Sequence, residues 1–465
     1  MFTMTFASES KLPLYEQLYR RIRGDIESGD LIRNERLPSK RKLAKHLQVS
    51  IFTVQNAYTQ LLEEGYIISL EKKGYFVSAE LLDSGEKSNN LSPKKLKLPI
   101  TPALSSHSLI YDLKTNSVDT DHFPYSVWSR LMRESMREKP AVLLNTGHPQ
   151  GDEALRAEIA RYLRSFRDVK VRPEQIILGA GIEYLIGLIT ELLPKAIFAY
   201  ENPGYQKIRK ILESRRMNTL PVLVDHGGVN VERLSQTKAN AVFVTPSNHF
   251  PTGAVMGIGR RRQLIEWAEQ KDDRYIIEDD FDSEFRFFLK PIPALQSLGA
   301  EKKIIYINSF AQTLAPSLRI AYAVLPEKLL QYYHASLMFY SCTVSQFEQL
   351  TLGRFLRGGY YERHLARMKT TYKNRQNAFI ESLSPVRCKL IVDGQKAGLR
   401  LCIKSSKLSE KKLVKSALEK GVRVYPFSGY YSSSPPETRT VVIGYAGYSS
   451  DTLRRIAELL QSAWI

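Results

Sequence analysis

Short polar side chains and a cluster of basic ones near the N-terminus could bind a nucleic acid. Residues 31–48 hold six Lys or Arg and one Asp or Glu, and Ser50, Thr53 and Gln55 follow directly. Hydroxyl and amide groups can hydrogen-bond a base edge or a phosphate, while Lys and Arg attract the phosphate backbone. The net charge of +19 also suits a polyanion, but the local cluster is more informative than the total.

Three helices are predicted around these residues. Between residues 12 and 28 apolar side chains recur every four positions, which predicts a helix with one apolar stripe. The stripe consists of Leu14, Leu18, Ile22 and Ile26. Ser39 is a typical N-cap for a second helix. After a short turn, a third helix fits residues 51–64 and ends at Gly65.

A β-hairpin is predicted directly after the third helix. Residues 67–77 alternate in polarity around Lys72, Lys73 and Gly74, which indicates a hairpin with a basic tip. One helix, a helix-turn-helix and a basic hairpin within about 80 residues make a winged helix. The N-terminal segment is therefore expected to bind double-stranded DNA.

The rest of the chain is predicted to form a larger α/β domain. A chain of 465 residues is too long for one ordinary core. Residues 81–105 are polar and read as a linker. From residue 106 onward, helical patterns alternate with β-rich runs, which argues for a mostly parallel sheet. After about residue 370 the pattern changes to a C-terminal α+β subdomain. The candidate strands of the sheet lie within 175–181, 196–200, 241–246, 275–281, 304–310 and 319–325.

Composition excludes several other classes of protein. With 43% hydrophobic and 25% charged residues, the chain reads as globular. No apolar run approaches the roughly 20 residues of a membrane span, and the N-terminus lacks a signal-peptide pattern. Cys342, Cys388 and Cys402 are too few and too irregular for a disulfide framework or a zinc site. A cytoplasmic protein with no metal site is expected.

Both halves of the chain resemble known families. LPSKRKLAKHLQVSIFTVQNAYTQLLEEGYI and KKGYFV resemble the GntR-type winged helix-turn-helix. The motifs TGHPQGDEALR, LGAGIEYL, ENPGY, TPSNHFPTG, IIEDDFDSEF and SLRIAY, in that order, are similar to fold-type I pyridoxal-phosphate (PLP) aminotransferases. The combination resembles the MocR/GabR regulators, in which an aminotransferase domain senses a small amine or vitamin. It implies a DNA-binding domain over residues 1–80 and an aminotransferase-like domain over 106–465.

The GntR resemblance assigns roles within the winged helix. It implies that the third helix reads the major groove, that Arg41 contacts DNA and that the hairpin tip is the wing. Many relatives carry an arginine where this chain has Ile51, so either Ile51 or Phe52 touches a thymine methyl group or both simply pack. Two half-sites and a head-to-tail homodimer are also implied. The predicted DNA-binding residues are Ser39, Arg41, Ser50, Thr53, Gln55, Lys73 and Gly74.

The aminotransferase resemblance assigns a cofactor pocket. It implies that Asp279 pairs with the pyridinium nitrogen of PLP, and that Ser309 and Arg319 bind the phosphate beside a glycine-rich turn. Tyr205 either stacks on the ring or packs in the core. Asn248 or His249 is the candidate partner of the phenolic oxygen. The predicted cofactor-binding residues are Gly181, Ile182, Tyr205, Asp279, Ser309 and Arg319.

Three departures from the family argue against catalysis. Gln312 occupies the position of the Schiff-base lysine, and its amide nitrogen is neither a nucleophile nor a base. Phe281 stands where related regulators usually have a tyrosine, and Gly447 stands where an arginine would grip a substrate carboxylate. Lys302 and Lys303 are the nearest lysines in sequence. No catalytic residue is therefore predicted, and an ordinary amino acid is not the expected effector.

Three interpretations stay open at this stage. The first is a regulator whose larger domain dimerises and senses an unidentified small molecule, or serves only as a scaffold. The second is a regulator that still holds PLP, or its amine form PMP, without a covalent bond. The third is an enzyme that uses PMP without a lysine, for which position 312 offers no base.

Overall fold

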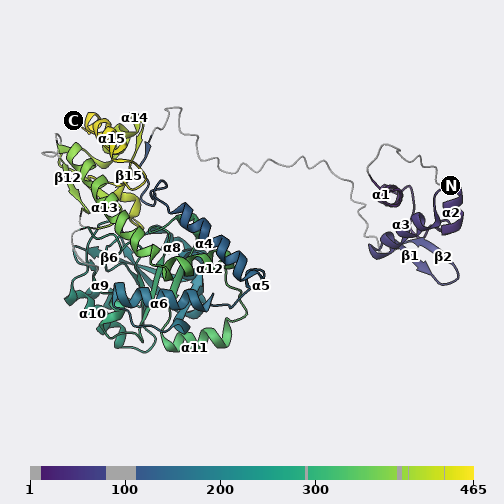
Figure 1. Ribbon diagram of the computed structural model, residues 1–465, viewed down its shortest axis with the longest axis horizontal. Helices are drawn as coiled ribbons and strands as arrows, with labels where there is room; N and C mark the ends of the chain where they lie inside the picture. The colour runs from purple at the N-terminus through teal and green to yellow at the C-terminus, as the bar shows by residue number, and fades with distance from the viewer. Residues whose placement is uncertain are drawn as a thin grey trace. The chain divides into compact units, whose positions relative to one another are not determined.

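The structure is a computed structural model that describes residues 12–79, 111–287, 292–384, 390–395, 397–433 and 435–464. The chain forms two compact units, residues Met1–Ala103 and Leu104–Ile465 (Figure 1). The predicted linker, residues 81–105, lies outside the described residues, as does Cys388. Each unit is considered by itself below.

The N-terminal unit is a winged helix. Helices α1 (Leu14–Glu27), α2 (Lys40–Leu47) and α3 (Ile51–Glu63) precede the antiparallel hairpin of β1 (Ile67–Leu70) and β2 (Gly74–Val77). The predicted apolar stripe lies on α1, but its first member, Leu14, is 45% exposed at the first residue of the helix. Leu18, Ile22 and Ile26 are buried as expected.

Two serine caps define the helix-turn-helix. The Ser39 hydroxyl accepts a hydrogen bond from the Lys42 backbone N–H (3.3 Å), and the Ser50 hydroxyl accepts one from the Thr53 backbone N–H (3.0 Å). Each cap satisfies a donor that a helix N-terminus otherwise leaves unpaired. Gln48 ends α2 in the left-handed conformation (φ 54°), which reverses the chain within a short turn before α3 starts.

Tyr58 ties the three parts of the DNA-binding unit together. Its ring is buried, and its hydroxyl donates to the Pro38 carbonyl (2.9 Å), directly before α2. The same ring meets Tyr75 of the wing edge-on, with centroids 5.0 Å apart. Because Tyr58 lies on α3, one side chain sets the start of α2, the reading helix and the wing relative to one another.

The larger unit is built on an eight-stranded mixed sheet with the order β4-β11-β10-β9-β8-β5-β6-β7. The strands β6, β5, β8, β9 and β10 run parallel, whereas β11 is antiparallel to both of its neighbours, and β7 is antiparallel to β6. Of these strands, β6 and β7 were not predicted. The bounds are β4 Ile176–Gly179, β5 Ile197–Asn202, β6 Asn218–Asp225, β7 Gly228–Val229, β8 Ala241–Val244, β9 Tyr275–Asp279, β10 Ile304–Ser309 and β11 Ala321–Val324.

Helices cover both faces of this sheet (Figure 1). On β10, Ile305 and Ile307 pack in one hydrophobic cluster with α7, α8 and α11, whereas Ile304 and Tyr306 face the clusters on the opposite side. Alternate side chains of a strand point to opposite faces, so a strand buried on both faces is apolar throughout. The helices are α4 Tyr125–Glu138, α5 Pro140–Leu143, α6 Glu153–Arg167, α7 Ile182–Leu192, α8 Gln206–Ser214, α9 Val231–Ser235, α10 Ile258–Glu269, α11 Glu327–Ser336, α12 Gln346–Arg357 and α13 Tyr360–Ser382.

The C-terminal part adds a smaller antiparallel sheet, ordered β12-β13-β16-β15. Its strands are β12 Leu390–Asp393, β13 Arg400–Ser405, β15 Tyr425–Pro426 and β16 Thr440–Gly444, packed with α14 (Glu410–Glu419) and α15 (Ser450–Trp464). The short β14 (Val422–Arg423) pairs in parallel with β3 (Tyr111–Asp112). The first described residues of the larger unit, in β3, therefore pair with its C-terminal part.

Two kinds of feature are absent from the described ranges. None of the helices there is both long and apolar enough to cross a membrane. In the same ranges, no group of three His, Cys, Asp or Glu side chains is arranged to hold a metal ion.

The core of the N-terminal unit predicts a stability difference between two leucines. Leu43 on α2 is fully buried, whereas Leu70 at the end of β1 is 41% exposed. We expect Leu43→Ala to lower the free energy of opening of α2 and α3 by about 2–5 kcal/mol, and Leu70→Ala to change it by less than about 0.5 kcal/mol. Amide hydrogen exchange of the full chain measures both. Equal effects of the two variants would contradict this packing.

Candidate functional site

The predicted DNA-binding residues lie on the exposed parts of the N-terminal unit. Arg41, Gln55 and Lys73 are exposed, and so are the two capping serines. Thr53 and Gly74 are half-buried. Within residues 12–79 the Arg41 side chain forms no ion pair, so its charge is available to a phosphate. Ser39 and Ser50 cap the first turns of α2 and α3, where helix dipoles favour anions, and Lys73 and Gly74 lie at the tip of the wing.

Two further basic residues lie near the wing and were not predicted to bind DNA. The Lys40 ammonium lies 5.6 Å from the centre of the Tyr75 ring, at the start of α2. The exposed Arg36 forms a β-bridge with Phe76, and its guanidinium faces Gly74. Both belong to the basic cluster of residues 31–48, which the structure thus brings beside the wing.

In the larger unit, the predicted cofactor residues come together in one pocket, here called the central pocket. It lies at the carboxyl ends of the parallel strands, where ligands of open α/β sheets bind. The predicted residues that line it are Gly181, Ile182, Tyr205, Asp279, Ser309 and Arg319, together with Gln312 and Phe281. Thr115 and Asn116, from the segment after β3, line it as well and were not predicted.

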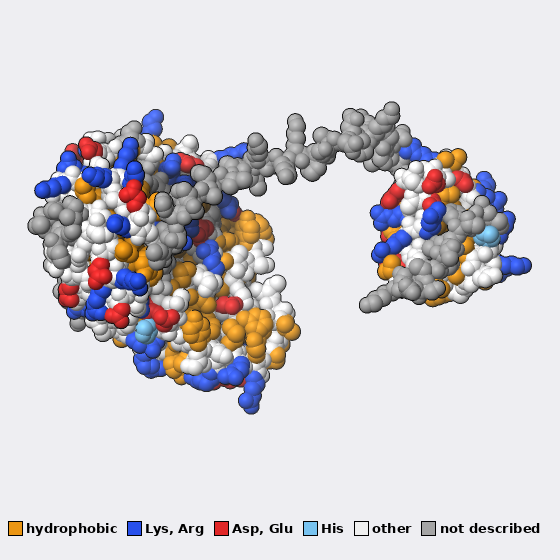
Figure 2. Space-filling view, turned by 90° about the horizontal axis from the view of Figure 1, so that it is seen from above, with side chains coloured by type: hydrophobic (Ala, Val, Ile, Leu, Met, Phe, Trp, Pro, Cys, Tyr) orange, Lys and Arg blue, Asp and Glu red, His pale blue; other side chains and the backbone are white. Residues whose placement is uncertain are grey.

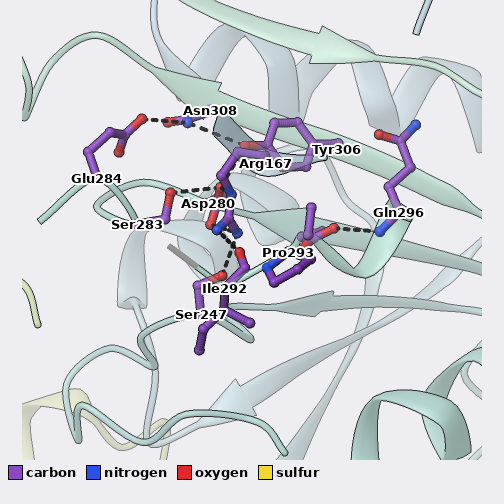
Figure 3. A network of polar contacts seen from close by, with 12 residues as sticks. Arg167, Ser247, Asp280, Ser283, Glu284, Ile292, Pro293, Gln296, Tyr306 and Asn308 are labelled. Carbon is purple, nitrogen blue, oxygen red and sulfur yellow. Dashed lines mark hydrogen bonds and ion pairs between the residues drawn. The ribbon is translucent and has the colours of Figure 1, made fainter. Parts of the chain in front are cut away.

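Asp279, on one side of the central pocket, is positioned by its neighbour Asp280. Asp280 points to the opposite face of the sheet, where it forms a buried ion pair with Arg167 of α6 (Nε–Oδ2 2.7 Å). The Tyr306 and Ser283 hydroxyls also donate to Asp280 Oδ2, at 2.6 and 2.9 Å (Figure 3). Successive side chains alternate across a strand, so this network fixes the end of β9 and directs Asp279 into the pocket.

The carboxyl group of Asp279 has an unused hydrogen-bond acceptor. Asp279 is buried, and its Oδ1 atom has no hydrogen-bond partner among the described residues. Burial, together with the nearby Asp280 and Asp282, raises the pKa of Asp279 to about 8. Buried polar atoms are nearly always paired. An unpaired acceptor beside a pocket therefore indicates a ligand with an N–H or O–H donor.

The opposite end of the pocket is charged. Gly181 has φ +91°, and a Cβ there would lie only 2.4 Å from the Arg319 guanidinium, so a side chain would fill this corner. The Arg319 guanidinium donates to Glu183 (2.7 Å), and the Lys207 ammonium donates to the same carboxylate (2.8 Å). These hydrogen bonds lower the pKa of Glu183 to about 2 despite its partial burial. The predicted phosphate arginine thus already has an internal anionic partner.

Lys207 is a lysine of the central pocket that was not predicted from the sequence. Neither Lys302 nor Lys303 lines the central pocket, whereas Lys207 does, because α8 starts beside the N-terminus of α7. The hydrogen bond to Glu183 raises the pKa of Lys207, which keeps the amine protonated. A protonated amine is not a nucleophile, so Lys207 is a poor substitute for the lysine missing at position 312.

Asn248 and His249, the candidate partners of the phenolic oxygen of PLP, are not among the residues that line the central pocket. The Asn248 amide donates to Asp282 (2.8 Å), and His249 Nδ1 is bonded to the Thr252 hydroxyl (2.7 Å). Neither residue is among those that line the central pocket, so the expectation that one of them reaches into it is wrong. Asp282 competes for Asn248 because the buried Arg400 holds it in place (2.7 Å). Gly447 does not line the pocket either.

An aromatic wall completes the central pocket. Tyr205 and Phe281 each meet Phe250 edge-on, with ring centroids 5.7 and 6.3 Å away. The Arg400 guanidinium lies 4.9 Å from the Phe250 ring and 5.2 Å from the Phe281 ring. Tyr205 is 42% exposed, which favours the interpretation that its ring meets a ligand over the interpretation that it packs in the core.

Comparisons with known proteins agree with this arrangement. Residues 14–77 match bacterial regulatory proteins of the gntR family, and residues 110–460 match aminotransferase class I and II. The uncharacterised HTH-type transcriptional regulator YdeL of Bacillus subtilis (strain 168) is 37% identical over 456 residues, 97% of each chain. The probable rhizopine catabolism regulatory protein MocR of Rhizobium meliloti is 31% identical over 478 residues, 98% of this chain and 95% of that protein.

The chain belongs to the MocR-type regulators. This MocR-type regulator is a DNA-binding transcriptional regulator that joins a GntR winged helix to an aminotransferase-like unit. The larger unit is also similar to Pyrococcus horikoshii kynurenine aminotransferase solved with PMP, with a TM-score of 0.68 and 22% identity over 77% of this chain and 91% of that one. That likeness shows the fold alone.

The central pocket of this MocR-type regulator fits part of a PLP molecule. The free Oδ1 of Asp279 suits the protonated ring nitrogen, and Tyr205 suits the ring. Gly181 and Ser309 lie where the phosphate would bind, whereas Arg319 there is already paired with Glu183. When bound in aminotransferases, PLP withdraws electrons from a substrate carbon. Here Gln312 offers no amine, and its half-buried side chain leaves Oε1 without a partner among the described residues.

The protonation of Asp279 makes a prediction about stability and pH. Its pKa is about 8 in the folded protein and near 3.8 when unfolded, so between these values unfolding releases a proton. The protonated carboxyl group of Asp279 therefore contributes its full stability below pH 4, and this contribution is lost as the pH rises to 8. Over that range the free energy of unfolding falls by at most about 1.4 kcal/mol per pH unit. We expect the stability advantage of Asp279→Asn over the wild type to grow with pH in calorimetry of the larger unit.

Glu183→Gln is the matched control, since the folded pKa of Glu183 is lowered rather than raised. Glu183 contributes stability above pH 4.5 and loses it as the pH falls toward 2. The difference between this variant and the wild type should thus change in the acidic range and stay constant between pH 6 and 8. Parallel stability curves for Asp279→Asn and the wild type would contradict the assigned protonation.

Proposed function

We propose that this protein is a transcriptional regulator whose aminotransferase-like unit binds a small-molecule effector without catalysing a reaction. The observation that carries the proposal is the composition of the central pocket. Gln312 takes the place of the reactive lysine, and the only lysine among the described lining residues, Lys207, is ion-paired with Glu183. The pocket can hold and orient a ligand, but it offers no free amine or base for transamination.

The regulator is proposed to act as a homodimer on two half-sites of operator DNA in the bacterial cytosol. Large apolar side chains are exposed on the larger unit, among them Val142, Leu144 and Phe339. Figure 2 shows hydrophobic side chains gathered on one face of this unit. Exposed apolar patches mark interaction surfaces, and a dimer would hold two winged helices for two half-sites.

A second candidate function is a regulator that holds PLP or PMP without a covalent bond. The unpaired Oδ1 of Asp279 favours it, because both forms of the cofactor carry a ring nitrogen that donates when protonated. The third interpretation, an enzyme that uses PMP, needs a base close to the reacting carbon, and Gln312 provides none at that position. Cofactor absorbance after purification separates a cofactor-binding regulator from one that binds another effector.

Arg41 tests the DNA-binding geometry. We expect Arg41→Ala to weaken binding of the full chain to a duplex selected from a random-sequence library. The slope of log K against log salt should fall by about 0.9, since one phosphate contact is lost. Binding titrations at several salt concentrations measure both quantities. Arg41→Lys keeps the charge and should keep the slope, and an unchanged affinity and slope in Arg41→Ala would refute the assignment.

Gln312 tests the absence of catalysis. With PLP added, we expect no visible band that borohydride fixes onto the peptide containing residue 312. Gln312→Lys should regain covalent attachment, although weakly, because Phe281 cannot hold the phenolic oxygen. Mass spectrometry of the reduced protein detects the attached group.

A borohydride-stable adduct on the unmutated protein would overturn the proposed lack of catalysis. The variant Lys207→Arg then identifies its source, because it keeps the ion pair with Glu183 but removes the amine. Loss of the adduct in this variant would assign the reactive amine to Lys207. An adduct that survives would assign it to another lysine.

A further inference from the structure

The outward face of α3 begins with two large apolar side chains. Ile51 is 49% exposed and Phe52 is 69% exposed. The core of the N-terminal unit instead takes Val54, Ala57, Tyr58 and Leu61 from the opposite face of the helix. Neither Ile51 nor Phe52 packs in the hydrophobic cluster of residues 12–79. The alternative that they simply pack within this unit is therefore excluded for the described residues.

The surroundings of this apolar pair are polar and positively charged. Gln55 is exposed and lies four positions after Ile51 and three after Phe52, so all three share one side of the helix. Arg41 and Lys45 of α2 are exposed, and neither α2 nor α3 has an acidic residue in its first turn. A purely apolar partner would leave these cations desolvated without a counter-charge, at a substantial free-energy cost.

The major groove of DNA offers both apolar groups and flanking anions. In the major groove, the 5-methyl group of thymine is exposed between two rows of phosphates, and apolar side chains contact it. The amide of Gln55 can form two hydrogen bonds with an adenine in the same groove. The Ser50 hydroxyl, which caps α3, accepts from the backbone of Thr53 and also lies 2.8 Å from its hydroxyl, so these two groups satisfy each other.

We propose that Ile51 and Phe52 read thymine methyl groups in the operator, and that this contact, rather than a charged one, sets the sequence preference of the reading helix. The inference rests on the proposed function, because it requires α3 to enter the major groove. It assigns phosphate attraction to Arg41, Lys45 and the wing, and base selection to the apolar pair with Gln55.

The test compares thymine with deoxyuridine, which lacks only the 5-methyl group. The full chain first selects duplexes from a random-sequence library, and each thymine of the selected half-site is then replaced by deoxyuridine. We expect thymine at fixed positions, and about a fourfold loss of affinity for each methyl group that is contacted, the value of one buried methylene. Phe52→Ala and Ile51→Ala should bind the thymine duplex more weakly and lose the difference between thymine and deoxyuridine.

Two control variants separate this contact from general DNA affinity. Lys73→Ala, at the wing tip, should weaken binding to both duplexes by the same factor. Thr59→Ala changes an exposed residue further along α3 and should keep the full methyl effect. Circular dichroism of each variant confirms that the winged helix is folded.

Each possible result decides the inference. It is overturned if the wild type binds thymine and deoxyuridine duplexes equally, or if the methyl effect survives in both Phe52→Ala and Ile51→Ala. Those results leave the proposed function intact, because a sequence was still selected. Selection of no sequence at all would instead overturn DNA reading by α3, and this inference with it.

Discussion

The ion pair between Arg167 and Asp280 holds the end of β9, and the groups of the central pocket are placed relative to that end. Both side chains are buried, so each would cost several kcal/mol to bury without the other. Tyr306 and Ser283 add hydrogen bonds to the same carboxylate oxygen. The network thereby holds the Asp280 carboxyl group on one face of the sheet, while burial raises the pKa of the neighbouring Asp279 on the other.

The larger unit has the fold of an aminotransferase, but position 312 holds a glutamine instead of a reactive amine. The sheet, the glycine turn before α7 and the aspartate at the end of β9 are all in place. The reaction nevertheless depends on one amine, and Gln312 does not supply it. The pocket has an aromatic wall and the unpaired acceptor Oδ1 of Asp279. At its other end Glu183 pairs with Arg319 and Lys207. Under the proposed function, such a site would distinguish ligands without transforming them.

The winged helix meets a different physical requirement, since α3 must satisfy two surroundings at once. Its inner face fills the core, and Tyr58 links that core to both the start of α2 and the wing. Its outer face, which begins with Ile51 and Phe52, is exposed among residues 12–79. Because the inner contacts are rigid, the positions of the outer side chains follow from the packing behind them.

Local interactions made much of this structure predictable from the sequence. The Ser39 cap, the glycine end of the third helix and the four-residue periodicity depend on neighbours in the chain, so the helices of the DNA-binding unit were identified. Short β-rich runs likewise identified six of the eight central strands. The glutamine at position 312, where the aminotransferase resemblance implies a lysine, is likewise a matter of identity at one position.

Only the tertiary structure decided which charged groups meet in the pocket. Glu183 lies 24 positions before Lys207 and 136 before Arg319, and the three come together because β4 pairs with β11 and α7 packs on α8. Asn248 is likewise drawn away from the pocket by Asp282, which Arg400 holds from the C-terminal sheet. The burial that raises the pKa of Asp279 also arises from residues far apart in sequence. Electrostatic environment is a property of the packed chain, because it sums charges and solvent exclusion over every segment that folding brings near.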